Sequence, residues 1–179
     1  MKSWMQKSHD ARSEPATSGM ACALHDLFLD ELAELYSAEK QIIKTLPALI
    51  KASHSEELRK ALEVHLKETE IHAARLEKAA KSLGTTLAQT NCKGMQGILE
   101  DGCDTLKEQK NKPCLDATLI AAAQKVEHYE IASYGAVCAW GREIGHEEAV
   151  SLLEVTLNEE KAADETLTEI AESLANAKG

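Results

Sequence analysis

Apolar residues recur every three or four positions along most of this chain, which is the spacing of an amphipathic helix. Two long stretches with this pattern cover about residues 24–52 and 55–83, and the second ends before Gly84, a residue suited to a helix C-terminus. Two more cover about residues 113–144 and 146–177. The pattern predicts two helical hairpins in succession.

The connection between the hairpins, residues 85–112, is long and mostly polar. It contains one short apolar pattern that suits an extra helix of about three turns. That pattern comprises Met95, Ile98, Leu99, Cys103 and Leu106. A connection of this length leaves two arrangements open, because the second hairpin can lie parallel or antiparallel to the first.

The two hairpins are copies of one unit. Residues 62–83 align with residues 153–174 without a gap, and 9 of the 22 positions are identical. The offset of 91 residues also pairs two glutamates of one hairpin with two of the other: Glu39 with Glu130, and Glu68 with Glu159. Each copy alone would leave its apolar stripe in water, so we expect the copies to pack together.

The four paired glutamates are equally distant from the turns of their hairpins. Glu39 and Glu68 are centred between residues 53 and 54, and the other pair is centred between residues 144 and 145. Antiparallel helices with a short connection bring such residues to the same height. Four glutamates from four helices in one layer are typical of a metal site.

The composition supports a single all-α domain. Alanine, leucine, glutamate and lysine dominate the 179 residues, aromatic residues make up 3%, and there are three prolines. The net charge of -10 argues against general binding to nucleic acid or to an anionic membrane. We expect a flexible tail over residues 1–23, with DNA association through residues 1–20 as an alternative, and a cytoplasmic location, since no signal peptide or membrane span is evident.

The five cysteines, at positions 22, 92, 103, 114 and 138, are odd in number and contain no CxxC pair. Neither a disulfide framework nor a thiolate iron site is indicated. We expect buried or incidental thiols. Redox sensing by the three central cysteines is an alternative, because they fall within or beside the connection between the hairpins.

The last predicted helix has a core stripe whose two middle members are acidic. The stripe, with spacings of four and three residues, comprises Leu153, Leu157, Glu160, Asp164, Leu167, Ala171 and Leu174. A buried carboxylate is tolerated when it is paired or holds a metal. The stripe therefore predicts a cation at mid-height in the bundle.

Further ligand candidates share helix faces with these glutamates. His65 and His72 flank Glu68 at spacings of three and four residues, and Glu127 lies three residues before Glu130. Mixed carboxylate and imidazole ligands suit iron, manganese or zinc, and a set rich in carboxylates favours iron or manganese.

Four segments of the chain resemble the ferritin-like superfamily and, within it, the bacterial stress-associated YciF-like proteins. They are YSAEKQ at 36–41, HLKET at 65–69, AAQKVEHYEIASY at 122–134 and LNEEKAAD at 157–164. The resemblance covers about residues 24–174. It implies a ferritin-like four-helix bundle with a short extra helix, a homodimer, and a two-metal site like that of rubrerythrins, in which Glu127 joins Glu130.

The sequence departs from the ferritin-like pattern at two positions. The usual Glu-x-x-His pairs are absent, because Ile71 follows Glu68 by three residues and Ala162 follows Glu159 by three. His65 or His72 can substitute on the second helix. On the fourth, Glu160 and Asp164 are in reserve, chiefly as groups that support the ligands. An oxygen-rich centre with two unequal metal positions is expected.

The predicted ligands are Glu39, His65, Glu68, His72, Glu127, Glu130 and Glu159. We expect two iron ions, with manganese as the alternative, in a protein that acts in the stress response. The expected chemistry is iron oxidation linked to peroxide or oxygen, as in a di-iron oxidase or peroxidase, or metal sequestration. The alternative is a helical structural or interaction protein that has lost the metal site.

Overall fold

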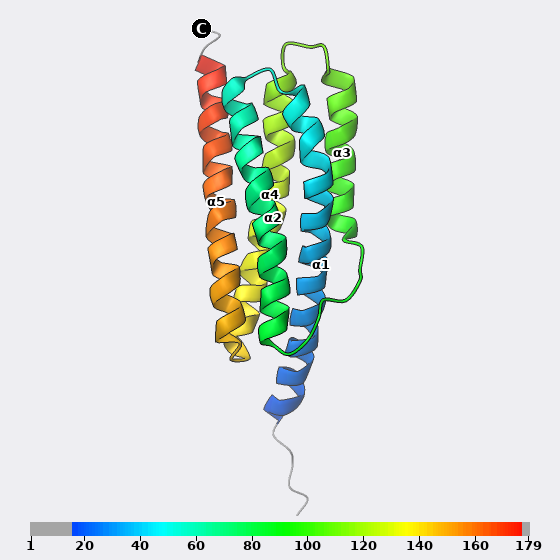
Figure 1. Cartoon of the computed structure of the whole chain (residues 1–179), viewed down its shortest axis with the longest axis vertical. Helices are drawn as coiled ribbons and strands as arrows, with labels where there is room; N and C mark the ends of the chain where they lie inside the picture. The colour runs from blue at the N-terminus through cyan, green and yellow to red at the C-terminus, as the bar shows by residue number, and fades with distance from the viewer. Residues whose placement is uncertain (1–15, 177–179) are drawn as a thin grey trace, which may run out of the picture.

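Five α-helices account for most of residues 16–176, which are the part of the chain that the structure, a computed structural model, describes. Four long helices form a bundle: α1 (Ala16–Ala52), α2 (Glu56–Ser82), α4 (Leu115–Glu143) and α5 (Glu147–Asn176). Helix α3 (Lys93–Gln109) packs outside the bundle against α1 and α4 (Figure 1). The predicted all-α fold with a short extra helix is confirmed.

The crossover decides how the two hairpins meet. Helix α1 contacts α2 and α4, and α5 contacts the same two helices, so the four form a closed ring. In Figure 1, α1 and α5 run upward while α2 and α4 run downward. Every neighbouring pair in the ring is therefore antiparallel. This resolves the orientation that the sequence left open, because α3 returns the chain to the end at which α2 began.

The helix boundaries follow local chemistry. The side chain of Ser55 caps α2 by accepting a hydrogen bond from the backbone N–H of Leu58 at 3.3 Å. Gly84 and Gly145 follow α2 and α4 with φ angles of 73° and 75°. This left-handed conformation is inexpensive for glycine and reverses the chain direction at a helix end.

Helix α1 begins earlier than the apolar pattern predicted. Helix α1 starts at Ala16, so residues 16–23, which the sequence assigned to a flexible tail, are helical. Residues 19–23 are exposed, which explains why they have no apolar stripe to reveal the helix. Residues 1–15, and with them most of the segment considered for DNA association, lie outside the described residues. No helix within residues 16–176 is long and apolar enough to cross a membrane.

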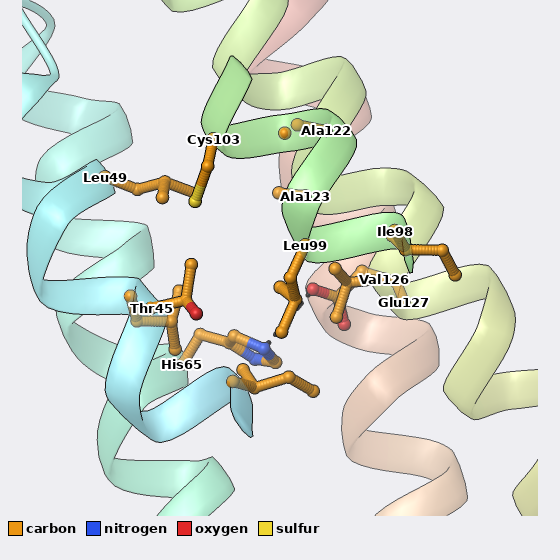
Figure 2. A pocket seen from close by; sticks show the side chains of 13 residues that line it. Thr45, Leu49, His65, Ile98, Leu99, Cys103, Ala122, Ala123, Val126 and Glu127 are labelled. Atoms are coloured by element: carbon orange, nitrogen blue, oxygen red, sulfur yellow. Dashed lines mark ion pairs between the residues drawn. The ribbon is translucent and has the colours of Figure 1, made fainter. Parts of the chain in front are cut away.

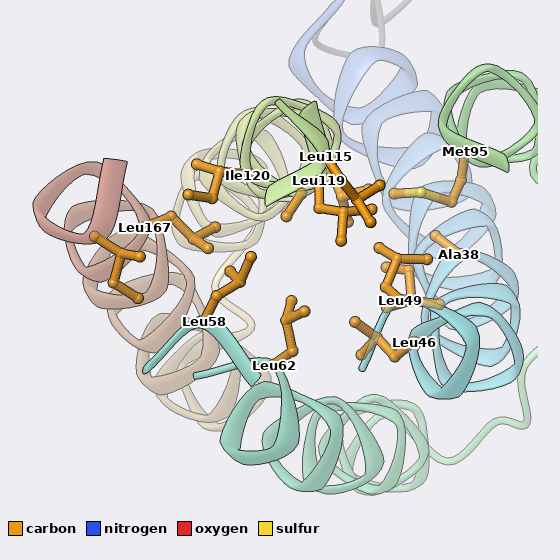
Figure 3. Close-up of a cluster of buried hydrophobic side chains, with 14 of the residues drawn as sticks. Ala38, Leu46, Leu49, Leu58, Leu62, Met95, Leu115, Leu119, Ile120 and Leu167 are labelled. Carbon is orange, nitrogen blue, oxygen red and sulfur yellow. The ribbon is translucent and has the colours of Figure 1, made fainter. Parts of the chain in front are cut away.

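The core consists of two apolar clusters with a polar layer between them. One cluster contains Leu46, Leu58, Leu119 and Leu167 and surrounds the bundle axis (Figure 3). The other lies toward the opposite end and includes Phe28, Leu32, Leu76, Val137 and Leu153. On each of the four bundle helices, the buried polar residues fall where one cluster gives way to the other. The polar layer is thus insulated from water at both ends.

Candidate metal centre

Each helix of the bundle contributes acidic or imidazole side chains to the polar layer. All six residues are at most 6% exposed as a whole, and they are Glu39 from α1, His65 and His72 from α2, Glu127 and Glu130 from α4, and Glu160 from α5. They face inward because they continue the same helical stripes as the leucines above and below them. The sequence alone therefore predicted that this layer exists.

The layer divides into two groups with metal-ligand spacing. Within each group, one ligand atom per residue lies within 4.8 Å of the others. One group is His65, Glu127, Glu130 and Glu160, and the other is Glu39, His72 and Glu160. Because Glu160 belongs to both, the two groups adjoin and share one carboxylate.

His72 links the layer to the protein surface. Its Nδ1 lies 2.8 Å from Oε1 of Glu160 and 3.8 Å from Oε1 of Glu39. Its Nε2 lies 3.0 Å from Oε2 of Glu159, which is itself hydrogen-bonded by the guanidinium of Arg75. The ring is thereby held between an inner and an outer carboxylate. The hydroxyl of Tyr134 donates a 2.5 Å hydrogen bond to Oε1 of Glu39.

Several ligand atoms in the layer have no hydrogen-bond partner within the described residues. They include both oxygens of Glu130, Oε2 of Glu39, Oε2 of Glu127 and both ring nitrogens of His65. The Nε2 of His65 lies 3.3 Å from Oε1 of Glu127, within ion-pair distance only. Buried polar groups are nearly always partnered, so this many unsatisfied atoms in one place calls for a missing partner.

The pKa values show the cost of burying so many acids. Burial raises the pKa of Glu39 to about 8 and raises the pKa of Glu127 and Glu130 well above the usual value, and the charge of Glu160 adds to all three shifts. Burial also lowers the pKa of His65. Burial opposes protonation of His72, but its contacts with Glu160 outweigh this and raise its pKa.

A metal ion fits this donor set. Protons partly neutralise the acids of the metal-free layer, and cations could take their place. No lysine or arginine within residues 16–176 forms an ion pair with any of the four buried glutamates. Carboxylate oxygens and imidazole nitrogens suit iron and manganese.

Two of the predicted ligands lie outside the layer. Glu68 and Glu159 are half-buried and line an open groove of about 370 Å³ between α2 and α5. The hydrogen bond from Arg75 lowers the pKa of Glu159, while partial burial raises the pKa of Glu68. His65 lines the same groove, so the groove reaches the layer. The structure thus brings five of the seven predicted ligands together.

Glu160 is the member of the layer that was not among the predicted ligands. The sequence did show it in the core stripe of the last helix but assigned it a supporting role, because the repeat pointed to Glu159. In the structure, the 91-residue offset aligns buried positions of α2 with buried positions of α5. At this height it pairs Thr69 with Glu160, and both residues are fully buried. The position within the stripe was the more informative signal, because burial depends on helix phase.

A four-helix bundle with a buried layer of carboxylates and histidines defines a protein of the ferritin-like class. Comparison with known proteins identifies the group within it: the chain belongs to the family described as "Domain of unknown function (DUF892)", whose model matches residues 23–179. Protein YciF of Escherichia coli (strain K12) is 38% identical over 156 residues, 87% of this chain and 94% of YciF. The resemblance to YciF-like proteins is confirmed.

Solved structures agree with this assignment. The crystal structure of the E. coli stress protein YciF matches with a TM-score of 0.82 and 38% identity over 86% of this chain and 97% of that one. YcfI of Rhodopseudomonas palustris, described as a proposed structural protein, matches with a TM-score of 0.79 and 38% identity over 91% and 98% of the two chains. A Xanthomonas campestris protein shares the fold at 22% identity, with a TM-score of 0.69 over 86% of this chain and 95% of its own.

Proposed function

We propose that this protein binds two transition-metal ions, iron or manganese, in the polar layer of its bundle. The observation that carries the proposal is the burial of four glutamates without a lysine or arginine partner among the described residues: Glu39, Glu127, Glu130 and Glu160. A metal-free layer needs bound protons to offset this charge, whereas two divalent cations offset it directly.

The donor groups suggest how the ions are held. Glu39 and His72 would serve one ion, His65, Glu127 and Glu130 the other, and Glu160 both. The resulting positions differ in their ligands, which agrees with the inequality expected from the sequence. Bound iron or manganese would supply one-electron redox chemistry.

The chain's own groups would orient these ligands. Glu159 accepts the Nε2 proton of His72, which leaves Nδ1 free to face the layer. Arg75 in turn holds Glu159 in place. A carboxylate that fixes the tautomer of a metal-binding histidine usually strengthens binding, so we assign Glu159 this role rather than that of a direct ligand.

The groove between α2 and α5 supports a route by which cations reach the layer. Its walls include four glutamates against one lysine: Glu57, Glu68, Glu159 and Glu169 against Lys60. Such an excess of negative charge raises the local concentration of cations. We assign Glu68 to this route, because it is half-buried in the groove beside His65.

The biological setting that we propose is the stress response, as the description of the E. coli relative suggests. There the ions would be oxidised by peroxide or oxygen, in oxidase or peroxidase chemistry, or would simply be sequestered. We further propose a cytoplasmic homodimer. Light scattering in solution tests the dimer, which should have twice the mass of the 19.5 kDa chain.

Elemental analysis of the purified protein, combined with anomalous diffraction at the metal edges, tests the metal proposal directly. We expect two ions per chain in the wild type and a loss of metal in the double variant E39Q/E130Q. The matched control is E63Q/E70Q, which changes two exposed glutamates of α2 and should retain both ions. Metal-free wild-type protein that gains no thermal stability from added iron or manganese would contradict the proposal.

A structural role without chemistry is the second candidate. The description of the R. palustris relative favours it, because that protein is proposed to be structural. Under this role, neither metal nor the E39Q/E130Q change should matter to function. The same elemental analysis therefore separates the two candidates.

A further inference from the structure

A small apolar cavity lies beneath α3, between that helix and α1 and α4. Its volume of about 20 Å³ leaves room for one small molecule. Figure 2 shows His65 and Glu127 near one end of the cavity, with Leu49, Cys103 and Ala122 toward the other. The cavity thus touches the candidate metal centre on a different side from the acidic groove.

The walls of the cavity are almost entirely carbon. Ile42, Leu46 and Val126 are buried residues of α1 and α4 on its inner side, while Leu99 and Cys103 of α3 are half-buried and form the outer side. The hydroxyl of Thr45 donates to the backbone carbonyl of Gln41 and is not free for a ligand. Such a lining offers a water molecule few hydrogen-bond partners and favours an apolar guest.

His65 stands where the cavity meets the polar layer. Its side chain is 7% exposed, and neither ring nitrogen has a hydrogen-bond partner among the described residues. It lines both the cavity and the acidic groove. A molecule in the cavity would therefore lie beside a residue that we assign to metal binding.

We propose that this cavity binds one small, uncharged, apolar molecule, for which dioxygen is the physiological candidate, next to the metal centre. Peroxide suits the cavity poorly, because its two O–H groups would lose hydrogen bonds to water without gaining partners from carbon walls. Dioxygen loses almost nothing on leaving water. The assignment of dioxygen as the oxidant rests on the proposed metal function, whereas binding of an apolar guest does not.

The cavity exists because α3 covers the bundle. Residues of α3 provide its outer wall, and without them Ile42 and Val126 would face solvent. Cys92, the residue that caps α3, attaches the start of α3 to α1. Its backbone N–H donates a 2.9 Å hydrogen bond to the Ser37 hydroxyl. Helix α3 therefore supplies the wall that turns this side of the bundle into an apolar pocket.

Xenon binding to the metal-free protein tests the cavity without reference to activity. In crystals pressurised with xenon, we expect an anomalous peak between α1, α3 and α4, and in solution a chemical-shift change of dissolved xenon. A123L should abolish both signals, because the larger side chain fills the cavity. The matched control is A132L, the same change at an exposed position of α4, which should leave both signals unchanged.

A second variant guards against misfolding of A123L. L99A removes part of the outer wall and should raise xenon occupancy, with helical circular dichroism confirming the fold. Absence of xenon from the cavity in both the wild type and L99A would overturn the inference and leave the metal proposal intact. Xenon in the cavity of a protein that binds no metal would overturn the assignment of dioxygen as the oxidant of a metal centre and support only the apolar site.

The choice between oxidants has its own test. In protein loaded with ferrous iron, A123L should slow oxidation by dioxygen roughly tenfold, the effect of a few extra methylenes in an apolar pocket, and leave oxidation by hydrogen peroxide unchanged. Equal slowing of both reactions would overturn the assignment of dioxygen.

Discussion

Glu159 and Glu160 are adjacent in α5, but their side chains point in different directions and so have different roles. Glu160 is fully buried in the layer, whereas the side chain of Glu159 is 32% exposed and bound by Arg75. Successive residues on an α-helix point about 100° apart, so both cannot face the bundle axis. Helix phase therefore sets which of the two can touch a metal ion.

Substitution of these two residues should have distinct effects on metal binding. E160Q removes a charge shared by both groups of ligands, and we expect the number of bound ions to fall. E159Q leaves the layer intact and should keep the number of ions but weaken binding about 10-fold to 100-fold through the orientation of His72. Isothermal titration with manganese measures both quantities. Loss of ions from E159Q with retention in E160Q would reverse our assignment.

The metal-free protein should become more stable when a buried carboxylate is removed. Glu130 is fully buried, and neither of its oxygens has a hydrogen-bond partner among the described residues. E130M replaces it with an apolar side chain of similar length, and we expect a gain of about 1–3 kcal/mol in the free energy of unfolding. Urea denaturation at pH 8 with a chelator measures it. E70Q, at an exposed site, should change stability by less than about 0.5 kcal/mol.

At the scale of elements, Gly141 of α4 lies tightly against side chains of α5 and α1. A Cβ atom at Gly141 would lie 2.5 Å from Cγ2 of Val150 and 3.0 Å from Cε2 of Phe28. At Gly135, on the same helix, a Cβ would meet nothing within 4 Å. The glycine at position 141 thus allows the helices to pack closely near the turn, while the one at 135 serves no such purpose.

These two glycines form a matched pair for substitution by alanine. We expect G141A to destabilise the fold by about 1–3 kcal/mol, because Val150 has a stiff side chain that cannot move aside. G135A should stabilise it by about 0.5–1 kcal/mol, since alanine favours helix. Thermal or urea unfolding measures both, and destabilisation of equal size by the two changes would show that packing at Gly141 is not limiting.

The cysteines of the connection have unlike surroundings. Cys92 is fully buried, with its Sγ 3.0 Å from the hydroxyl of Tyr129, whereas Cys114 is exposed and Cys103 lines the apolar cavity. Their closeness in sequence suggested a shared redox role. Cys92 caps the start of α3, where its Sγ accepts a hydrogen bond from the backbone N–H of Met95, whereas Cys103 lies within α3 and Cys114 follows it.

For the whole molecule, the buried acids determine how stability depends on pH. The pKa of Glu39 is raised from 4.5 to about 8 on folding, and those of Glu127 and Glu130 are also raised well above their usual value. The folded protein therefore holds more protons than the unfolded chain between these values, and stability falls as pH rises through that window. The raised pKa of His72 acts in the same direction, while the lowered pKa of His65 opposes it.

We expect the metal-free protein to lose on the order of 3 kcal/mol of stability between pH 5.5 and pH 8. Metal ions compete with the same protons, so the stabilisation that they provide should grow over this range. Urea denaturation at a series of pH values, with chelator and with manganese, measures both trends. A metal-free protein that is most stable near pH 8 would show that these acids are not buried in solution.

The sequence by itself determined the all-α fold, the two hairpins, the extra helix and the polar layer, because each of these follows from apolar periodicity. It also identified Glu39, Glu130 and Glu127 as members of that layer. The periodicity is local and is fixed by the geometry of a single helix.

Only the tertiary structure decided which side chains meet. It brought Glu160 into both groups of ligands, left Glu68 and Glu159 in the groove, and joined His72 to carboxylates on α1 and α5. It also created the apolar cavity under α3, which involves four helices. These outcomes depend on the relative rotation and height of separate helices, and no spacing within one segment of the chain contains that information.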